Sequence, residues 1–499
     1  MASHRPIVIR RGRLLDGATH KGEPADILIE GDTIRAIGPP GLDAPDSAAT
    51  MDAADRLLIP GLVNAHTHSD TSFAKGHGQA YTLELLLNAV PAVGLGQRAE
   101  DKHLAAKLAA VEMLSKGCTA CYDLFSELPG PTAEGLEAVA MAYRDVGMRA
   151  VVAPLMADRT FWQAIPGLID ALPPDLRREV DRIRAQPGAA QLEACRAALA
   201  RWPADRDQVR LALAPTIPHH CDDAFFRACR QLADEHGLGI QTHLAESKVQ
   251  AVVGLRKYGR TLAAHLDGLG IIGPDFTAAH AVWLDDEDVR RLADRGASVA
   301  HNPTSNLRLG VGVARTRAML DAELNVGVGT DGSTCSDGLN MFEAMRLACH
   351  VSRIQSPDPA DWLTTGQALA MATQGSAKAL GFGALIGQLE AGHKADLVFI
   401  DLAHVNYVPL NDPAAQLVLL EHGGALDKVM VGGRLVVDGG RVLTVDLVAL
   451  RAEVERAVDR LRANAADGRE LAARLEPIVG SFCIGLAREP YHVQRYVGA

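Results

Sequence analysis

Between residues 60 and 384 lie eight short apolar segments, most of which end in polar residues, and this pattern restricts the fold more than any other feature of the sequence. The segments end at His68, Tyr122-Asp123, Pro154-Leu155, Pro215-Thr216, His243, His280, His301-Asn302 and Thr330-Asp331. Stretches with helical spacing, such as 103–116 and 286–295, lie between them. Strands that alternate with helices predict an α/β fold with a parallel (β/α)8 TIM-like barrel, which carries its chemistry where the strands end.

The two ends of the chain share a different pattern. Residues 6–59 alternate short β-rich runs with Gly and Asp turns, and similar runs return at 395–400, 428–431 and 434–437. Since neither end can close a sheet by itself, we expect one small β-sandwich domain built from residues 1–59 and 385–445. The barrel then spans residues 60–384, and helices with a tail fill residues 446–499.

Two segments outside this scheme invite an interpretation. The connection over residues 158–207 is long for a barrel and contains Pro and Gly breaks, so it is either a lid over the barrel mouth or a surface excursion. The tail over residues 480–499 contains Phe482, Tyr491 and Tyr496. Its apolar content suggests packing on a neighbouring subunit, and we expect a homo-oligomer, either a dimer or a tetramer.

Composition excludes several classes of protein. The chain has 499 residues with 48% hydrophobic and 22% charged side chains, which is typical of a globular protein with a large core. A net charge of -11 argues against binding to nucleic acid, because that requires clustered Lys and Arg. No apolar run approaches the length of a membrane span, and residues 1–14 lack the apolar core of a secretory signal. Eight cysteines are too sparse for a disulfide scaffold, so we expect a cytoplasmic protein.

The polar residues at the strand ends suit a metal site. His66 and His68 occupy positions i and i+2 of a strand and so point to the same face, and His243 can supply a third nitrogen. An isolated His at a strand end can be a buried polar residue with hydrogen-bond partners, but five ionisable groups at successive ends favour a shared site. Three imidazoles and one carboxylate suit a divalent transition metal with a position left for water, and such a metal lowers the pKa of that water. The chemistry predicted is hydrolytic.

Five motifs resemble those of the amidohydrolase superfamily, within it the group that holds chlorotriazine hydrolases and adenosine, S-adenosylhomocysteine, guanine and cytosine deaminases. The motifs are residues 60–68 with His66-Thr67-His68, His243-x-x-Glu246, Ala279-His280, His301-Asn302-Pro303-x-Ser305-Asn306 and Gly329-Thr330-Asp331-Gly332. The resemblance covers nearly the whole chain. It implies that one divalent metal ion is held by His66, His68, His243 and Asp331. Zinc is the expected metal, with Fe²⁺ or Mn²⁺ as alternatives. One ion is favoured over two because the fourth strand, residues 209–218, lacks the bridging Lys of binuclear relatives.

The resemblance also implies a reaction. Metal-bound hydroxide would attack a ring carbon of an amino-substituted N-heterocycle and release ammonia. Glu246 would move the proton, His280 would orient the water or stabilise the forming oxyanion, and Asp331 would act as base. Removal of chloride or alkylamine from a triazine-like ring, or opening of a cyclic amide, is the alternative. A noncatalytic relative is disfavoured because the full ligand set is present.

Substrate contacts follow less directly from the sequence. His301, Asn302 and Asn306 are expected close to the substrate or on the loop that holds it. Asp158 and Arg159 could recognise a polar or anionic substituent, or form an ordinary ion pair. Adenosine-type deaminases usually carry a His about five residues before a Cys or Val in the region of the fourth strand. In this chain the Cys is Cys221, and the residue five positions before it is Thr216. His219 or His220 could take the place of that His, so recognition of an adenine nucleoside stays open.

Overall fold

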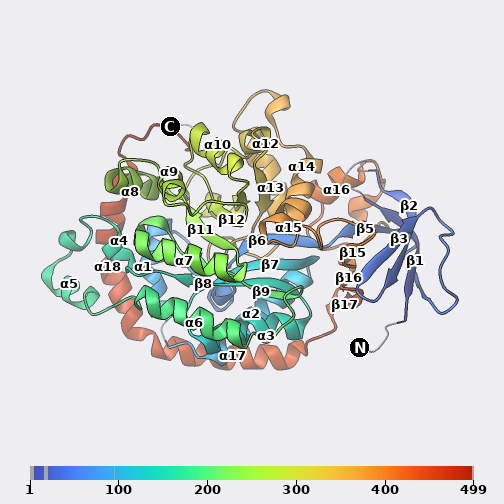
Figure 1. The fold of residues 1–499 in the computed structure, drawn as a ribbon, viewed down its shortest axis with the longest axis horizontal. Coiled ribbons are helices and arrows are strands. Elements are labelled where there is room, and N and C mark those ends of the chain that lie inside the picture. The colour runs from blue at the N-terminus through green and yellow to red at the C-terminus, as the bar shows by residue number, and fades with distance from the viewer. Residues whose placement is uncertain (1–4, 16–20, 95, 497–499) are drawn as a thin grey trace.

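The computed structural model describes residues 5–15, 21–94 and 96–496, and it confirms the predicted fold class: an α/β barrel beside a small β domain (Figure 1). Parts of the predicted β domain (residues 1–4 and 16–20) and the end of the C-terminal tail (residues 497–499) lie outside the described residues. Within the described part, no helix is long and apolar enough to cross a membrane.

Eight parallel strand positions form the barrel. They are β6 (Leu62–Thr67), β7 (Cys118–Phe125), β8 (Arg149–Met156), β9 (Val209–Leu211) with β10 (Ala214–Pro215), β11 (Ile240–Leu244), β12 (Phe276–His280), β13 (Ser298–His301) and β14 (Asn325–Val328). Two arcs, β10-β8-β7-β6 and β11-β12-β13-β14, meet at the bridge between Leu213 and Ile240. These strands are almost wholly buried because helices cover them from outside, which explains their continuous apolar runs.

The other seam of the barrel, between β6 and the segment after β14, is closed by a side chain. The buried Asn64 amide donates to the Thr330 hydroxyl at 2.7 Å, and its oxygen accepts from the Thr330 N–H at 3.0 Å. The Asp331 N–H donates to the His66 carbonyl at 2.9 Å. A side chain at Gly329 would place its Cβ 2.9 Å from the Cβ of His66, so only glycine allows this approach. The seam therefore brings His66 and Asp331 together.

Helices surround the barrel, and the ones after β6, β7, β10 and β11 have clear sequence signals. They are α1 (Leu83–Gly94), α2 (Ala99–Leu114), α3 (Ala133–Val146), α7 (Asp223–His236) and α8 (Lys248–Tyr258). The Thr132 hydroxyl caps the start of α3, and Gly147 ends it in the left-handed conformation. Further round the barrel lie α9 (Leu262–Gly268), α10 (Asp286–Asp294), α11 (Pro303–Arg308), α12 (Thr316–Asp321) and α13 (Met341–Arg353).

The β domain joins both ends of the chain in one sheet. Its strands are β1 (Ile7–Leu14), β2 (Glu23–Glu30), β3 (Thr33–Gly38), β4 (Ala49–Asp52), β5 (Arg56–Pro60), β15 (Leu397–Asp401), β16 (Leu426–Val431), β17 (Arg434–Asp438) and β18 (Arg441–Val442). The antiparallel pairing of β5 with β15, with Pro60 opposite Leu397, joins the two halves. Figure 1 shows these N- and C-terminal strands side by side. We propose that the domain boundaries fall after residues 59, 384 and 445, as the sequence suggests.

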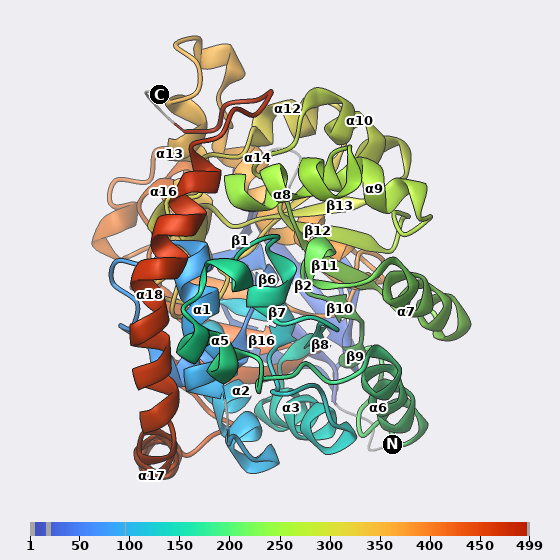
Figure 2. The same cartoon turned by 90° about the vertical axis from the view of Figure 1, so that its left-hand side faces the viewer.

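The long connection breaks where its Pro and Gly residues predict. It forms α4 (Phe161–Ala164), α5 (Pro174–Val180) and α6 (Gly188–Ala200). The C-terminal helices are α17 (Leu447–Asn464) and α18 (Ala466–Ala487), and α18 runs beside α1 (Figure 2). In the tail, the rings of Tyr491 and Tyr496 lie 6.1 and 5.0 Å from that of Trp283. These two side chains therefore pack on their own chain, where the sequence had suggested a neighbouring subunit.

Candidate metal centre

Six predicted site residues converge at the carboxyl ends of the barrel strands. His66 comes from β6 and His68 follows it directly, His243 and Glu246 come from β11 and the turn after it, His280 from the end of β12, and Asp331 from the turn after β14. The Asp331 Oδ1 lies 3.1 Å from His68 Nε2 and 3.6 Å from His66 Nε2. His243 Nε2 lies 3.3 Å from His68 Nε2. Donor atoms of His66, His68 and Asp331, and likewise of His66, His243 and His280, lie within 4.8 Å of one another.

Hydrogen bonds behind the histidines fix which ring nitrogen faces the centre. His68 Nδ1 donates to the Leu124 carbonyl and His243 Nδ1 to the Thr216 carbonyl. His66 Nδ1 contacts the oxygen of Gln241, whose amide nitrogen donates to the Ala65 carbonyl. Each ring is thus held by its Nδ1 and turns Nε2 toward the shared space, the arrangement usual for metal-binding histidines.

Nitrogen lone pairs of two histidines face the centre without a hydrogen-bond donor, and a cation between them would stabilise them. His66 Nε2 and His280 Nε2 are buried without a hydrogen-bond partner in the protein. Burial lowers the pKa of His66, and burial with the neighbouring histidines lowers that of His243 well below its usual range. Burial opposes charge on His68 as well, but the Asp331 carboxylate outweighs it and raises the His68 pKa to about 9. Neutral nitrogens of His66 and His243, a His68 that gives up its proton to a cation, and one carboxylate around a buried centre fit a divalent transition cation.

Asp331 is held as a carboxylate in spite of its burial. Burial alone would raise its pKa, but the two histidines that face it, His66 and His68, hold it well below the usual range. Its Oδ2 accepts from the Ser305 hydroxyl at 2.6 Å and its Oδ1 from the Gly332 N–H at 2.7 Å. The backbone of Asp331 is left-handed, with φ of 64°, and so is that of His280, with φ of 68°. Such strained residues gather at functional sites, where the surrounding structure enforces them.

Glu246 and His280 form a pair with opposite proton preferences. The Glu246 carboxyl lies 3.7 Å from His280 Nδ1 and is 1% exposed. Burial, then the nearby Asp331 and Glu84, raise the pKa of Glu246 well above its usual range, which favours the protonated carboxyl. Burial lowers the pKa of His280 to about 4, which keeps that imidazole neutral. A protonated acid and a neutral base beside the same centre suit proton transfer.

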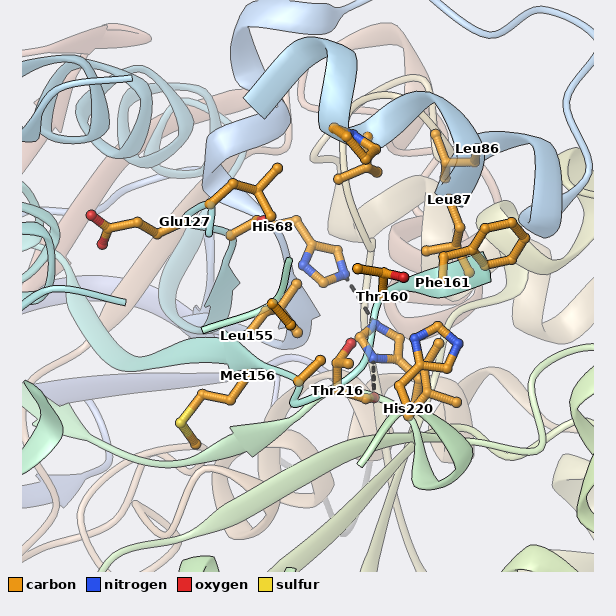
Figure 3. Close-up of a pocket in the computed structure, with 18 of the residues that line it drawn as sticks. His68, Leu86, Leu87, Glu127, Leu155, Met156, Thr160, Phe161, Thr216 and His220 are labelled. Carbon is orange, nitrogen blue, oxygen red and sulfur yellow. Dashed lines mark hydrogen bonds between the residues drawn. The ribbon is translucent and has the colours of Figure 1, made fainter. Parts of the chain in front are cut away.

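A cavity of about 630 Å³ opens onto this centre. His68, His243, Glu246 and Asp331 lie at one end of it, and α1, the turn after β7 and the start of the long connection form its walls. Figure 3 shows His68 and His220 between side chains of these walls. The position of the connection supports the lid interpretation, because residues 159–162 and 182–185 line the cavity.

The five predicted substrate-binding residues lie in different places. Arg159 lines the cavity and forms an ion pair with Asp222, whereas Asp158 accepts from the Asp222 N–H at 3.1 Å and lies outside the lining. The three others, His301, Asn302 and Asn306, are buried behind the lining residues, where the Asn306 oxygen contacts His280 Nδ1 at 3.0 Å.

Sequence reasoning did not find several residues that shape the centre. Gln241 shares a strand face with His243, so the same period of two that paired His66 with His68 could have found it. Ser305 was part of a quoted motif, but nothing in its spacing indicated a bond to Asp331. His220, left without a role by the sequence, lines the cavity; His219 does not.

A parallel barrel with histidines, an aspartate and a protonated glutamate gathered at its strand ends defines a metal-dependent hydrolase. The chain matches the amidohydrolase family over residues 57–436 and belongs to it. It is 30% identical over 445 residues to a 5-methylthioadenosine/S-adenosylhomocysteine deaminase of Pyrococcus abyssi, covering 88% of this chain and 96% of the relative. The predicted family and the class of hydrolase are thereby confirmed.

Solved structures agree with this assignment. An adenosine deaminase from Xanthomonas campestris with bound zinc superposes with a TM-score of 0.80 at 27% identity, covering 92% of this chain and 98% of that one. The atrazine chlorohydrolase TrzN from Arthrobacter aurescens, complexed with zinc, also gives a TM-score of 0.80, at 28% identity, covering 91% of this chain and all 100% of that one. One barrel therefore serves proteins named for different leaving groups.

Proposed function

We propose that this protein is a metal-dependent aminohydrolase that replaces the amino group of an N-heterocycle by oxygen and releases ammonia. The observation that carries the proposal is the buried Glu246 carboxyl, which lies beside His280 and Asp331 and lines the cavity. Relatives named as deaminases support it. The alternative, loss of chloride or alkylamine from a triazine-like ring or opening of a cyclic amide, uses the same centre and differs in the product.

His66, His68, His243 and Asp331 would hold the cation, and zinc is our choice because the structural relatives are described with zinc. When bound, such a cation polarises a water molecule and lowers its pKa toward neutrality. His280 orients the water through its free Nε2, which lies 3.7 Å from Asp331 Oδ2, and Asp331 accepts the water's proton. Glu246 gives its proton to the ring nitrogen next to the attacked carbon. The ring nitrogen keeps the proton from Glu246, the amino group takes the proton held by Asp331 and leaves as ammonia, and the new hydroxyl returns its proton to Glu246 as it becomes a carbonyl.

The substrate is held mainly by shape. His220 offers an unpartnered Nε2 in the cavity wall, and its pKa, lowered to about 3 by burial and then by Lys257, keeps it neutral. This nitrogen can bond to a heterocycle or its substituent. Asn306 holds His280 in place, and we propose that His301 and Asn302 support the same loop from behind, while Arg159 with Asp158 shapes the rim.

Screening tests the proposal directly. The purified protein, loaded with one equivalent of Zn²⁺, is incubated with aminopurines, aminopyrimidines, pterins and aminotriazines, and ammonia, chloride, alkylamine and ring-opened products are measured. We expect ammonia from at least one compound class. Chloride or alkylamine without ammonia would establish the alternative, and no product from any compound would overturn both.

Location and assembly are also proposals. None of the eight cysteines, all of them described, forms a disulfide, and this fits the reducing cytoplasm. Four apolar side chains close together in sequence, Val405, Val408, Leu410 and Leu420, are 37 to 76% exposed, which supports a homo-oligomer. Light scattering after gel filtration would give the number of subunits.

A further inference from the structure

One wall of the cavity, formed by α1 and α4, is built from apolar side chains. Leu86, Leu87 and Val90 of α1 are only half-buried, and all three line the cavity. Phe161 and Trp162 of α4 face the same space, and Leu155 of β8 lies across from them. In Figure 3, Leu86, Leu87 and Phe161 lie together on one side of His68. An apolar surface that faces a cavity and not the core gains stability when an apolar ligand covers it.

This apolar wall is held rigidly. The Trp162 indole N–H donates to the Asn88 oxygen at 3.0 Å, and the Asn88 amide donates to the Ala472 carbonyl at 3.0 Å. These two bonds link α4 to α1 and α1 to α18, the pair that Figure 2 shows side by side. Since Asn88 is 3% exposed, the linkage lies out of water. The wall is therefore formed before a ligand arrives, which lowers the entropy lost on binding.

Most polar side chains beside this wall already have partners, and the unpartnered atoms, Gln191 Oε1 and His220 Nε2, carry no charge. Glu127 accepts from Thr132 and lies 3.1 Å from Lys102, and Figure 3 shows its carboxylate turned away from His68. Gln191 donates to two backbone carbonyls, and Arg159 is paired with Asp222. A charged substituent would lose water here without finding a free buried group of opposite charge.

Two cationic side chains at the rim of the cavity suggest a competing possibility, that the cavity binds an anionic substituent. Arg182 and Arg184 line the cavity from the turn between α5 and α6, and both are exposed. Because exposed charges are solvated and screened, they attract an anion weakly compared with a buried partner. An anionic arm that reached them would lie in water, and the apolar wall would stay uncovered.

We propose that the part of the cavity between α1 and α4 is a subsite for an uncharged, apolar substituent of the heterocycle, such as an alkyl, alkylthio or aryl arm. The inference rests on the proposed function and adds the substrate class: an aminoheterocycle with an apolar arm in place of one that ends in a carboxylate or amino acid. The arm lies between α1 and α4 while the ring lies against Glu246 and the metal ligands.

The test compares two arms on one heterocycle that releases ammonia in the screen, a butylthio arm and an arm of equal length ending in a carboxylate. We expect kcat/KM for the butylthio compound to be higher by at least about tenfold, the scale of discrimination in apolar pockets. Leu87→Arg should lower this ratio by at least about tenfold, since it places a cation in the wall. Leu443→Arg, at a leucine that is 54% exposed and outside the cavity, should keep the wild-type ratio. A ratio is measured because a general loss of activity cancels in it.

Two results of this comparison would contradict an apolar subsite. A wild-type preference for the carboxylate compound that is lost in Arg182→Gln and Arg184→Gln would assign an anionic arm, and an unchanged ratio in Leu87→Arg would remove the wall from recognition. If no compound releases ammonia, the proposed function fails while the subsite is still tested by calorimetric titration of the two compounds. Tighter binding of the butylthio compound, weakened in Leu87→Arg, would then retain the subsite; equal binding would refute it. Thermal unfolding of each variant confirms that it is folded.

Discussion

Replacing Glu246 by Gln separates proton transfer from metal binding. Gln has the same size and can keep the contacts with Gln250, whose side chain accepts from the Glu246 N–H at 3.0 Å and approaches the carboxyl at 3.4 Å. The change removes the transferable proton that the raised pKa of Glu246 preserves at neutral pH. A general acid contributes about 10²- to 10⁴-fold to turnover. We therefore expect a loss of at least about 100-fold, an increase of about 2.7 kcal/mol in the activation barrier.

Ammonia release at saturating substrate measures this loss, and elemental analysis measures the metal. Metal content should stay near wild type, and Glu455→Gln on the exposed face of α17 serves as the matched control. In the wild type, turnover should fall on the alkaline side, where Glu246 loses its proton, and the variant should lack this limb of the pH profile. A variant with full metal content and turnover within about tenfold of wild type would show that another group moves the proton.

Three further outcomes follow from the centre and the barrel seam. Ser305→Ala should weaken metal retention by about 10- to 100-fold in chelator competition, because the hydroxyl orients Asp331, and Ser305→Thr should restore it; equal retention in the alanine variant would contradict the role. Zinc uptake by the metal-free protein at pH 7.5 should release about one proton to a pH indicator, since His68 with a pKa of about 9 must lose its proton to bind; no release would refute this reasoning. Asn64→Leu should lower the free energy of unfolding in urea by about 2 to 4 kcal/mol, because the Thr330 N–H is then unpaired and its hydroxyl, which still donates to the Asp331 carbonyl, loses the Asn64 donor. A change below about 0.5 kcal/mol would show that the seam does not depend on this amide.

The strand ends were predictable because geometry leaves few choices. In a parallel barrel all carboxyl ends lie on one face, so His68, His243, His280 and Asp331 had to gather once the strands were identified. The period of two placed His66 beside His68. Boundaries were less certain: β7 continues to Phe125, two residues beyond the expected Asp123, because Leu124 and Phe125 are still buried between neighbouring strands.

Contacts between segments that lie far apart in the chain could not be predicted from the sequence. The bonds that orient the histidines come from the Leu124 and Thr216 carbonyls, and every residue has a carbonyl, so nothing in the sequence marks these two. The link from Trp162 to Asn88, which decides how the long connection meets α1, depends on the rotation of both side chains. The apolar residues of the tail indicated that another surface covers them. They did not indicate that this surface is Trp283 of the same chain.

The pairing of β5 with β15 also affects how the newly made chain acquires its structure. Pro60 finds its partner Leu397 only after more than three hundred intervening residues have left the ribosome. At about 5 to 20 residues per second, the early strands wait roughly 17 to 70 seconds with an unsatisfied edge. Ribosome-bound chains stopped before residue 397 should remain open to protease in residues 21–60, and chains stopped well after residue 442 should resist it. Early protection would mean that the amino-terminal strands fold without their late partners.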